Sequence, residues 1–147
     1  MIRTTLKRLI TSSMLYMAIA LIGAVVAITE NRPANAGGFS TGLPVVPDFL
    51  YGNGTAMSPP LYMLVAQAIF TVLAPRRDRW GTFGVGGLTI AGLLFAIGAL
   101  VEPILFEIFG PATFDFFKAT IEAGLIIVPL MMMVFGIREW TGRRRDT

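Results

Sequence analysis

Four long apolar stretches limit what this sequence can fold into. They cover residues 10–28, 58–74, 83–105 and 120–137, and none contains more than one charged residue. A helix needs about 20 residues to cross a hydrocarbon core about 30 Å thick. The second stretch is the shortest, because its main run covers only residues 60–74, and it spans only if residues 57–59 join that run or the bilayer thins locally. The pattern predicts an all-α integral membrane protein, with four transmembrane helices in one antiparallel bundle and a single membrane domain over residues 1–147.

The composition excludes several other classes of protein. Hydrophobic residues make up 54% of the chain and charged residues only 14%, against about 25% charged residues in an ordinary soluble domain. A soluble globule with so few charges would expose large apolar patches. Cysteine and histidine are both absent, so disulfide, haem and zinc chemistry are not expected. The sequence does not identify which cofactor, if any, the chain binds.

The basic residues indicate which way the helices cross. Cytoplasmic flanks of membrane spans are enriched in Lys and Arg. Ten of the twelve basic residues lie in segments that an up-and-down bundle brings to one side: Arg3, Lys7, Arg8, Arg76, Arg77, Arg79, Arg138, Arg143, Arg144 and Arg145. Both termini are therefore predicted to be cytoplasmic in a plasma membrane, with residues 138–147 as a basic tail. Trp80 and Trp140 are expected to anchor the same interface.

The first apolar stretch has two interpretations. Its basic start, its apolar run and the triplet Ala34-Asn35-Ala36 are typical of a secretory signal with a cleavage site. The run of about 19 residues is longer than the roughly 7 to 15 found in such signals, so we expect an uncleaved anchor. Cleavage would leave three spans with the same orientation.

Two segments are predicted to lie outside. The loop of residues 29–57 is rich in Gly and Pro, which oppose both a helix and a long strand, and its apolar residues predict that it lies against the bundle mouth or the lipid interface. In residues 102–118, Gly110-Pro111 is expected to break the helix. Five phenylalanines there predict an interfacial girdle or, alternatively, a gate for a lipid or hydrophobic ligand. They are Phe106, Phe109, Phe114, Phe116 and Phe117.

Small residues form stripes on two of the predicted helices. Membrane helices associate through close packing of small side chains and a few polar contacts. The stripes consist of Ala20, Gly23, Ala24 and Ala27 in the first span and Gly84, Gly87, Ala91 and Gly98 in the third. They predict close approach of these two spans inside one chain, or pairing of two copies in a homo-oligomer.

Three polar side chains in or beside the spans are candidates for a site. Glu102 follows 19 apolar residues and Glu122 is the third residue of the fourth stretch, so both are predicted near the outer face on adjacent antiparallel helices. Such a pair can share a proton or bind a cation. The alternative is that each carboxylate reaches headgroups and water, with Lys118 as a counter-ion. Gln67 is expected to make an interhelical hydrogen bond or to contact a substrate.

No arrangement typical of an enzyme active site is present: no histidine base, no metal-ligand spacing and no phosphate-binding loop occurs. The first hypothesis is a non-catalytic structural or accessory subunit of a membrane assembly, with a membrane-protein partner or a second copy. The alternative is a small proton- or cation-coupled transporter or channel that uses Glu102 and Glu122. A third is a lipid- or quinone-binding membrane enzyme. Membrane topology accounts for the basic runs, so no nucleic-acid partner is expected.

Overall fold

The structure, a computed structural model, describes residues 4–35, 37–108, 110 and 114–144. The elements in chain order are α1 (Thr4–Thr29), α2 (Val45–Tyr51), α3 (Leu61–Leu73), α4 (Arg79–Val101), α5 (Ile104–Ile108) and α6 (Phe116–Arg144). The described part of the chain is helical and contains no strand, only isolated bridges in the loop before α3. The predictions for Arg3, Ala36, Phe109, Pro111 and Arg145 lie outside the described residues.

Three of the helices are long and apolar enough to cross a membrane: α1, α4 and α6. The helix α3 is apolar but has only 13 residues, about 20 Å at 1.5 Å per residue. Pro59 and Pro60 precede it, and Pro60 adopts the extended backbone that comes before the first helical turn. The chain is therefore a helical membrane protein with three candidate spans and one shorter apolar helix.

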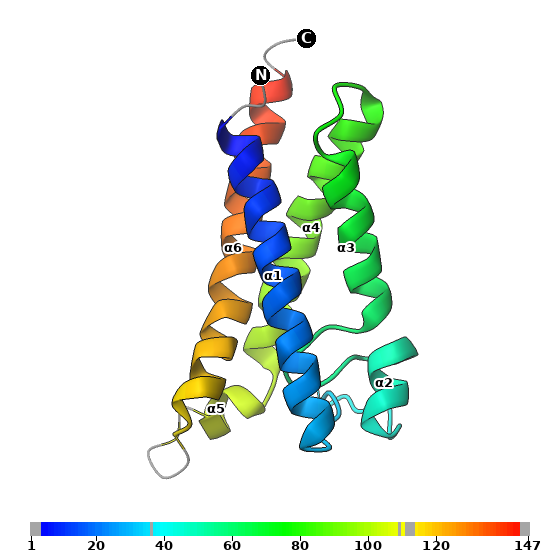
Figure 1. Cartoon of the computed structure of the whole chain (residues 1–147), viewed down its shortest axis with the longest axis vertical. Helices are drawn as coiled ribbons and strands as arrows, with labels where there is room; N and C mark the ends of the chain where they lie inside the picture. Colours follow the sequence, from blue (N-terminus) through cyan, green and yellow to red (C-terminus); the bar gives the residue numbers. More distant parts are fainter. Residues whose placement is uncertain (1–3, 36, 109, 111–113, 145–147) are drawn as a thin grey trace.

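The long helices form a bundle with two chemically different ends (Figure 1). The start of α1, the turn between α3 and α4 and the end of α6 lie together at what we call the basic end, which holds Lys7, Arg8, Arg76, Arg77, Arg79, Arg138 and Arg143. The short helices α2 and α5 lie at the opposite, acidic end, whose acids are Glu30, Asp48, Glu102, Glu107, Asp115 and Glu122. The helix α6 packs along both α4 and α1, while α3 packs against α4.

The small residues are used inside the chain, with partners that differ from those expected. A Cβ on Gly87 would lie 2.5 Å from the Phe70 ring of α3, and one on Gly92 would lie 2.6 Å from the Pro129 carbonyl oxygen of α6. Gly23 of α1 lies against the backbone of Met57 in the loop. The expected close approach of α1 and α4 does not form, because α3 and α6 pack along α4 instead.

The helices α1 and α4 contact each other through aromatic side chains. The rings of Tyr16 in α1 and Phe95 in α4 stack with their centroids 4.7 Å apart. Two large rings hold the backbones farther apart than two small residues would. Gly98, at the outer end of the predicted stripe, has no atom within 4 Å of where its Cβ would lie, which leaves room for a cavity beside it.

The helix ends also differ from the predicted spans. The helix α4 stops at Val101 rather than at residue 105, because Glu102 precedes Pro103 and takes the extended backbone that a following proline imposes (φ −73°, ψ 127°). At the other extreme, α6 is helical to Arg144, so most of the predicted basic tail continues the last span.

The loop of residues 29–57 contains a helix that its Gly and Pro content argued against. The helix α2 fits between Pro44 and Gly52, and Pro47 lies in its first turn, where a backbone N–H has no helical partner. Asp48 organises the loop: its Oδ1 accepts hydrogen bonds from the Thr41 hydroxyl at 2.9 Å and the Asn53 N–H at 2.8 Å. The loop is therefore a folded cap over the bundle.

Candidate functional site

The acidic end contains a cavity with two glutamates in its wall. Glu102 follows the last residue of α4, and Glu122 lies in the second turn of α6, where the antiparallel packing of these helices brings them together. Their side chains are 7% and 1% exposed, and both line a cavity of about 130 Å³. The other walls come from Tyr16, the loop before α3, and α4 around Gly98. The two residues that the sequence placed at similar depth share one site.

Glu102 is held by the backbone of the loop. Its Oε1 and Oε2 accept hydrogen bonds from the Asn35 N–H at 2.9 and 3.2 Å. Two residues further along the loop, the Gly37 N–H donates to the carbonyl of Val101, the residue before Glu102, at 3.1 Å. These bonds attach the loop to the last turn of α4 and fix the carboxylate at the cavity wall.

The Glu122 carboxylate, unlike that of Glu102, has an oxygen without a hydrogen-bond partner in the part of the chain that the structure describes. Its Oε1 is fully buried and has no hydrogen-bond partner among the described residues. The Glu102 carboxylate is close enough to repel it, and the Tyr16 hydroxyl also lies within electrostatic range. An unpartnered buried polar atom costs about 1–3 kcal/mol and a buried charge costs more. This oxygen is therefore available to a proton, a water molecule or a cation.

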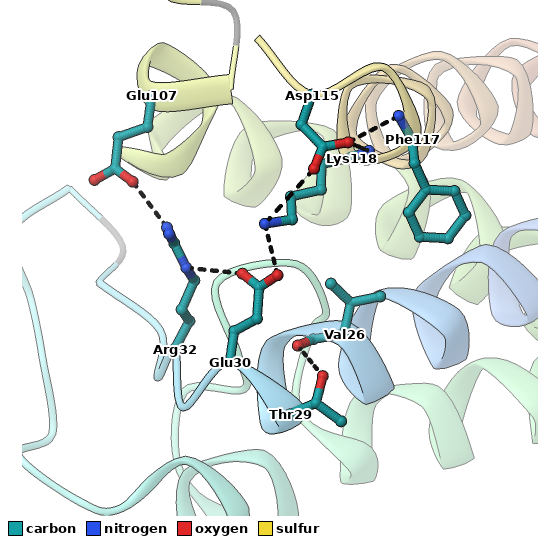
Figure 2. Close-up of polar contacts among 8 residues, drawn as sticks. All are labelled: Val26, Thr29, Glu30, Arg32, Glu107, Asp115, Phe117 and Lys118. Atoms are coloured by element: carbon teal, nitrogen blue, oxygen red, sulfur yellow. Dashed lines mark hydrogen bonds and ion pairs between the residues drawn. The ribbon is translucent and has the colours of Figure 1, made fainter. Parts of the chain in front are cut away.

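The basic residues at the acidic end do not neutralise this pair. Figure 2 shows Arg32 between Glu30 and Glu107, at 3.1 and 2.8 Å, and Lys118 between Glu30 and Asp115, at 2.6 and 3.8 Å. Arg32 and Lys118 are the only basic residues in the two sequence segments that were predicted to lie outside, residues 29–57 and 102–118. The expectation that Lys118 serves as counter-ion to these glutamates is wrong, because its ammonium pairs with Glu30 and Asp115 instead.

Burial and charge together disfavour ionisation of Glu102. Burial raises the pKa of Glu102 to about 7, the Asn35 N–H opposes that rise, and the negative charge of Asp48 adds to it. Asp48 is itself fully buried, with Oδ2 lacking a partner in the described part of the chain. Glu102, Glu122 and Asp48 are thus buried carboxylates at one end of the bundle, and none has a basic partner among the residues that the structure describes.

Gln67 connects the middle of the bundle. Its Nε2 donates to the carbonyl and hydroxyl oxygens of Ser13 at 3.0 and 2.9 Å, and Ser13 Oγ also lies 2.7 Å from Thr71 Oγ1. The amide thereby makes the interhelical hydrogen bond between α1 and α3. Its Oε1 is buried and lacks a partner among the described residues, which leaves an acceptor halfway along the molecule.

The basic end has its own buried carboxylate, and this one is paired. Glu139 is 3% exposed, and its Oε1 accepts from Arg143 Nε at 3.1 Å. The same guanidinium donates to the Ala74 carbonyl at 2.7 Å and the Arg76 carbonyl at 3.2 Å, which satisfies the C-terminal turn of α3. Arg143 therefore joins α6 to the α3–α4 turn.

A second cavity, of about 390 Å³, follows α3 and α4 towards the basic end. Its walls are apolar apart from Gln67, and it shares Met63, Leu94 and Phe95 with the cavity of the two glutamates. The predicted interface anchor Trp140 lines its far end and lies against Gly86. The other predicted anchor, Trp80, is 48% exposed at the start of α4.

Comparisons of the chain with protein-family models, curated proteins and solved structures find no match. The site is therefore interpreted from its own chemistry. Among the described residues, no group of three or more acidic side chains is arranged to hold a metal ion. Two carboxylates beside aromatic and aliphatic walls suit a proton or an organic cation, which needs charge and apolar contact together.

Sequence reasoning missed three residues of this arrangement. Asp48 lies in a loop whose folding was not foreseen, and Tyr16 was one apolar residue among many in the first span. Glu139 was hidden in a basic segment that we read only as a topology signal. The available signal for Glu139 was its spacing of four residues from Arg143, typical of a helical ion pair.

Proposed function

We propose that this protein is a small proton- or cation-coupled membrane transporter whose binding site is the Glu102–Glu122 pair. The observation that carries the proposal is the buried, unpartnered Oε1 of Glu122 in a cavity that it shares with Glu102. A purely structural role would favour a basic partner or an apolar side chain there, because an uncompensated buried charge destabilises a fold. Charged groups inside membrane proteins commonly mark ion or proton pathways.

Buried polar groups at other depths of the bundle support the movement of protons along it. Glu122 Oε1, Gln67 Oε1 and Glu139 Oε2 are all buried oxygens without partners among the described residues. Along α6, Glu122 and Glu139 are separated by about 26 Å, and Gln67 reaches Met132 between them, with Nε2 3.9 Å from the sulfur. Water molecules bound to these acceptors would form a route for protons.

The proposal includes a membrane topology. The helix α3 crosses together with the extended segment before it, which makes a fourth, shorter span in a locally thinned bilayer. Both termini and the basic end face the cytoplasm of the plasma membrane, and the loop of residues 29–57 faces outside, as the excess of Arg and Lys at one end favours. The two glutamates then open to the outer side.

The proposal is tested by proton flux into proteoliposomes. Purified protein is reconstituted in phosphatidylcholine vesicles that contain a pH-sensitive dye, and a potassium diffusion potential is applied. We expect flux well above that of protein-free vesicles, with a loss of at least ten-fold in Glu122→Gln and in Glu102→Gln. The control is Glu107→Gln, an exposed acid at the same end, which is expected to leave the flux unchanged.

Two results contradict the proposal. Flux in the Glu102→Gln and Glu122→Gln variants equal to that of the unchanged protein would exclude these carboxylates from the route. Flux no greater than in protein-free vesicles, with folded protein verified by circular dichroism, would exclude proton movement driven by voltage.

The accessory-subunit hypothesis is a second candidate, supported by a different observation. Four large apolar side chains at the acidic end are strongly exposed: Phe39 at 80%, Phe106 at 76%, Phe116 at 78% and Phe117 at 59%. Exposed aromatic side chains at one end of a bundle suit the lipid interface or a membrane partner. Purification in native lipid, with identification of every co-purifying protein, distinguishes the two: a stoichiometric partner supports this role, and a lone chain counts against it.

A further inference from the structure

The cavity of the two glutamates adjoins the apolar cavity between α3 and α4. Met63, Leu94 and Phe95 line both, so the two cavities lie next to each other along one side of α4. The apolar part reaches Gly86 and Trp140, about 18 Å from Gly98 at 1.5 Å per residue of α4. The combined space is short and polar at one end and long and apolar at the other.

The charges at the polar end favour a positive head. Glu102 and Glu122 are buried and have no basic partner among the described residues, while Arg32 and Lys118 are held in the surface network of Figure 2. The stacked rings of Tyr16 and Phe95 also line this end, and aromatic faces attract organic cations. An anionic head would meet two like charges.

The walls of the apolar cavity between α3 and α4 favour a hydrocarbon chain. Phe70, Phe83, Ile90 and Leu94 supply apolar surface. The rings of Trp140 and Phe70 pack directly against Gly86 and Gly87. Phe83 and Ile90 are 55% and 61% exposed, so this cavity opens on the lipid-facing side of α4. A chain can therefore enter it from the bilayer without crossing the bundle.

We propose that the substrate is an amphipathic amine, whose ammonium head binds between Glu102 and Glu122 and whose alkyl chain lies in the apolar cavity between α3 and α4. This inference rests on the proposed function, since it uses the same carboxylate pair, and it names the class of cation that the pair takes. Small inorganic cations would leave the apolar cavity unused.

The experiment follows quenching of Trp140 by a bromine atom on the chain. The chain has two tryptophans, so Trp80→Phe leaves Trp140 as the single fluorophore. The probe is octadecylamine brominated at its terminal carbon, mixed into phosphatidylcholine vesicles with the reconstituted protein. The matched probe is octadecanoic acid brominated at the same carbon. We expect the amine to reach half-maximal quenching at a mole fraction at least ten-fold lower than the acid.

Variants separate the head from the chain. Glu102→Gln with Glu122→Gln is expected to abolish the preference for the amine over the acid. Ala66→Phe places a ring in the apolar cavity from a half-buried position and is expected to reduce amine quenching at least ten-fold. Val72→Phe is the control on the same helix, because Val72 is 74% exposed. Its Trp140 fluorescence is expected to be quenched by the amine as strongly as in the parent.

The outcomes distinguish this inference from the proposed function. Unchanged quenching in Ala66→Phe, with the preference still lost in the glutamate double variant, overturns the chain site and leaves the carboxylate site standing. An amine preference that survives in the double variant overturns both. Equal quenching by amine and acid in the parent means that the cavity holds ordinary lipid chains, and it overturns the inference.

Discussion

Glu122 and Glu139 are the same residue type on the same helix, and both are almost completely buried, at 1% and 3% exposure. Glu139 has a guanidinium 3.1 Å away, and this guanidinium also binds two carbonyls of the α3 end. Glu122 has another carboxylate as its neighbour and an unpartnered oxygen in a cavity. Each carboxylate has one buried oxygen without a hydrogen-bond partner among the described residues, so the difference is that Glu139 has a basic partner and Glu122 has none there.

This difference teaches how to separate structural from functional charge in a membrane bundle. A buried acid with a base stabilises helix packing once the fold has formed, and removing either partner is costly. A buried acid without a base weakens the fold unless something else binds to it. Stability measurements should therefore respond in opposite directions at the two ends of α6.

The largest effect is expected at the basic end. Arg143→Met keeps the aliphatic stem but leaves Glu139 buried without its partner and removes the hydrogen bonds to Ala74 and Arg76. We expect the free energy of unfolding in mixed detergent micelles to fall by about 3–5 kcal/mol. Adding Glu139→Gln should recover part of the loss. Arg138→Met, at an exposed position of the same turn, is the control and should change little.

The next largest effect is a dependence of the free energy of unfolding on pH, caused by Glu102 at the acidic end. The pKa of Glu102 is raised from its ordinary 4.5 to about 7, so between these values the folded state binds more protons than the unfolded state. Stability must then fall as pH rises through this window, by up to about 3 kcal/mol. Asp48 and Glu122 are the charged groups that face Glu102.

Detergent unfolding at a series of pH values measures this slope. Glu102→Gln should flatten it, while Glu107→Gln, on the exposed surface, should keep it. A slope of the same size in Glu102→Gln would show that another group titrates, and it would remove Glu102 from the explanation.

A smaller effect of opposite sign to that of Arg143→Met is expected at Glu122. In mildly alkaline buffer, Glu122→Gln removes a charge that no base compensates, so the free energy of unfolding should rise by about 1–2 kcal/mol. The same variant is expected to lose proton flux, so that stability and function move apart. A destabilised Glu122→Gln protein would mean that this carboxylate has a stabilising partner, as Glu139 does.

Local patterns in the sequence predicted the helices well and the contacts poorly. Apolar runs and flanking bases are local properties, so the long helices α1, α4 and α6 and the membrane class followed from them. Gln67 was the single strongly polar side chain in its stretch, and its bond to α1 followed from the cost of leaving it unpaired. The helix α3 is shorter than predicted because residues before Leu61 are held in the loop by two prolines.

Partner choice depends on tertiary geometry and was harder to foresee. Lys118 is four residues from Glu122 in the sequence, a spacing that suggests a helical ion pair. It binds Glu30 instead, because the end of α1 brings that acid within 2.6 Å. The similar depth of Glu102 and Glu122 was expected from the sequence, whereas their common cavity and the contribution of the loop, through Asn35 and Asp48, needed a folded structure.

The smallest effect is expected in the surface network of the acidic end, which sharpens the contrast between exposed and buried acids there. Arg32 links Glu30 and Glu107, and the three side chains are 33–62% exposed. Exposed ion pairs contribute at most about 1 kcal/mol and are screened by salt. Arg32→Gln should therefore lower the free energy of unfolding by less than about 1 kcal/mol, and by less still in high salt. It should also leave proton flux intact, because the network does not reach Glu122. Loss of flux in Arg32→Gln would contradict the separation between the surface network and the buried carboxylate pair.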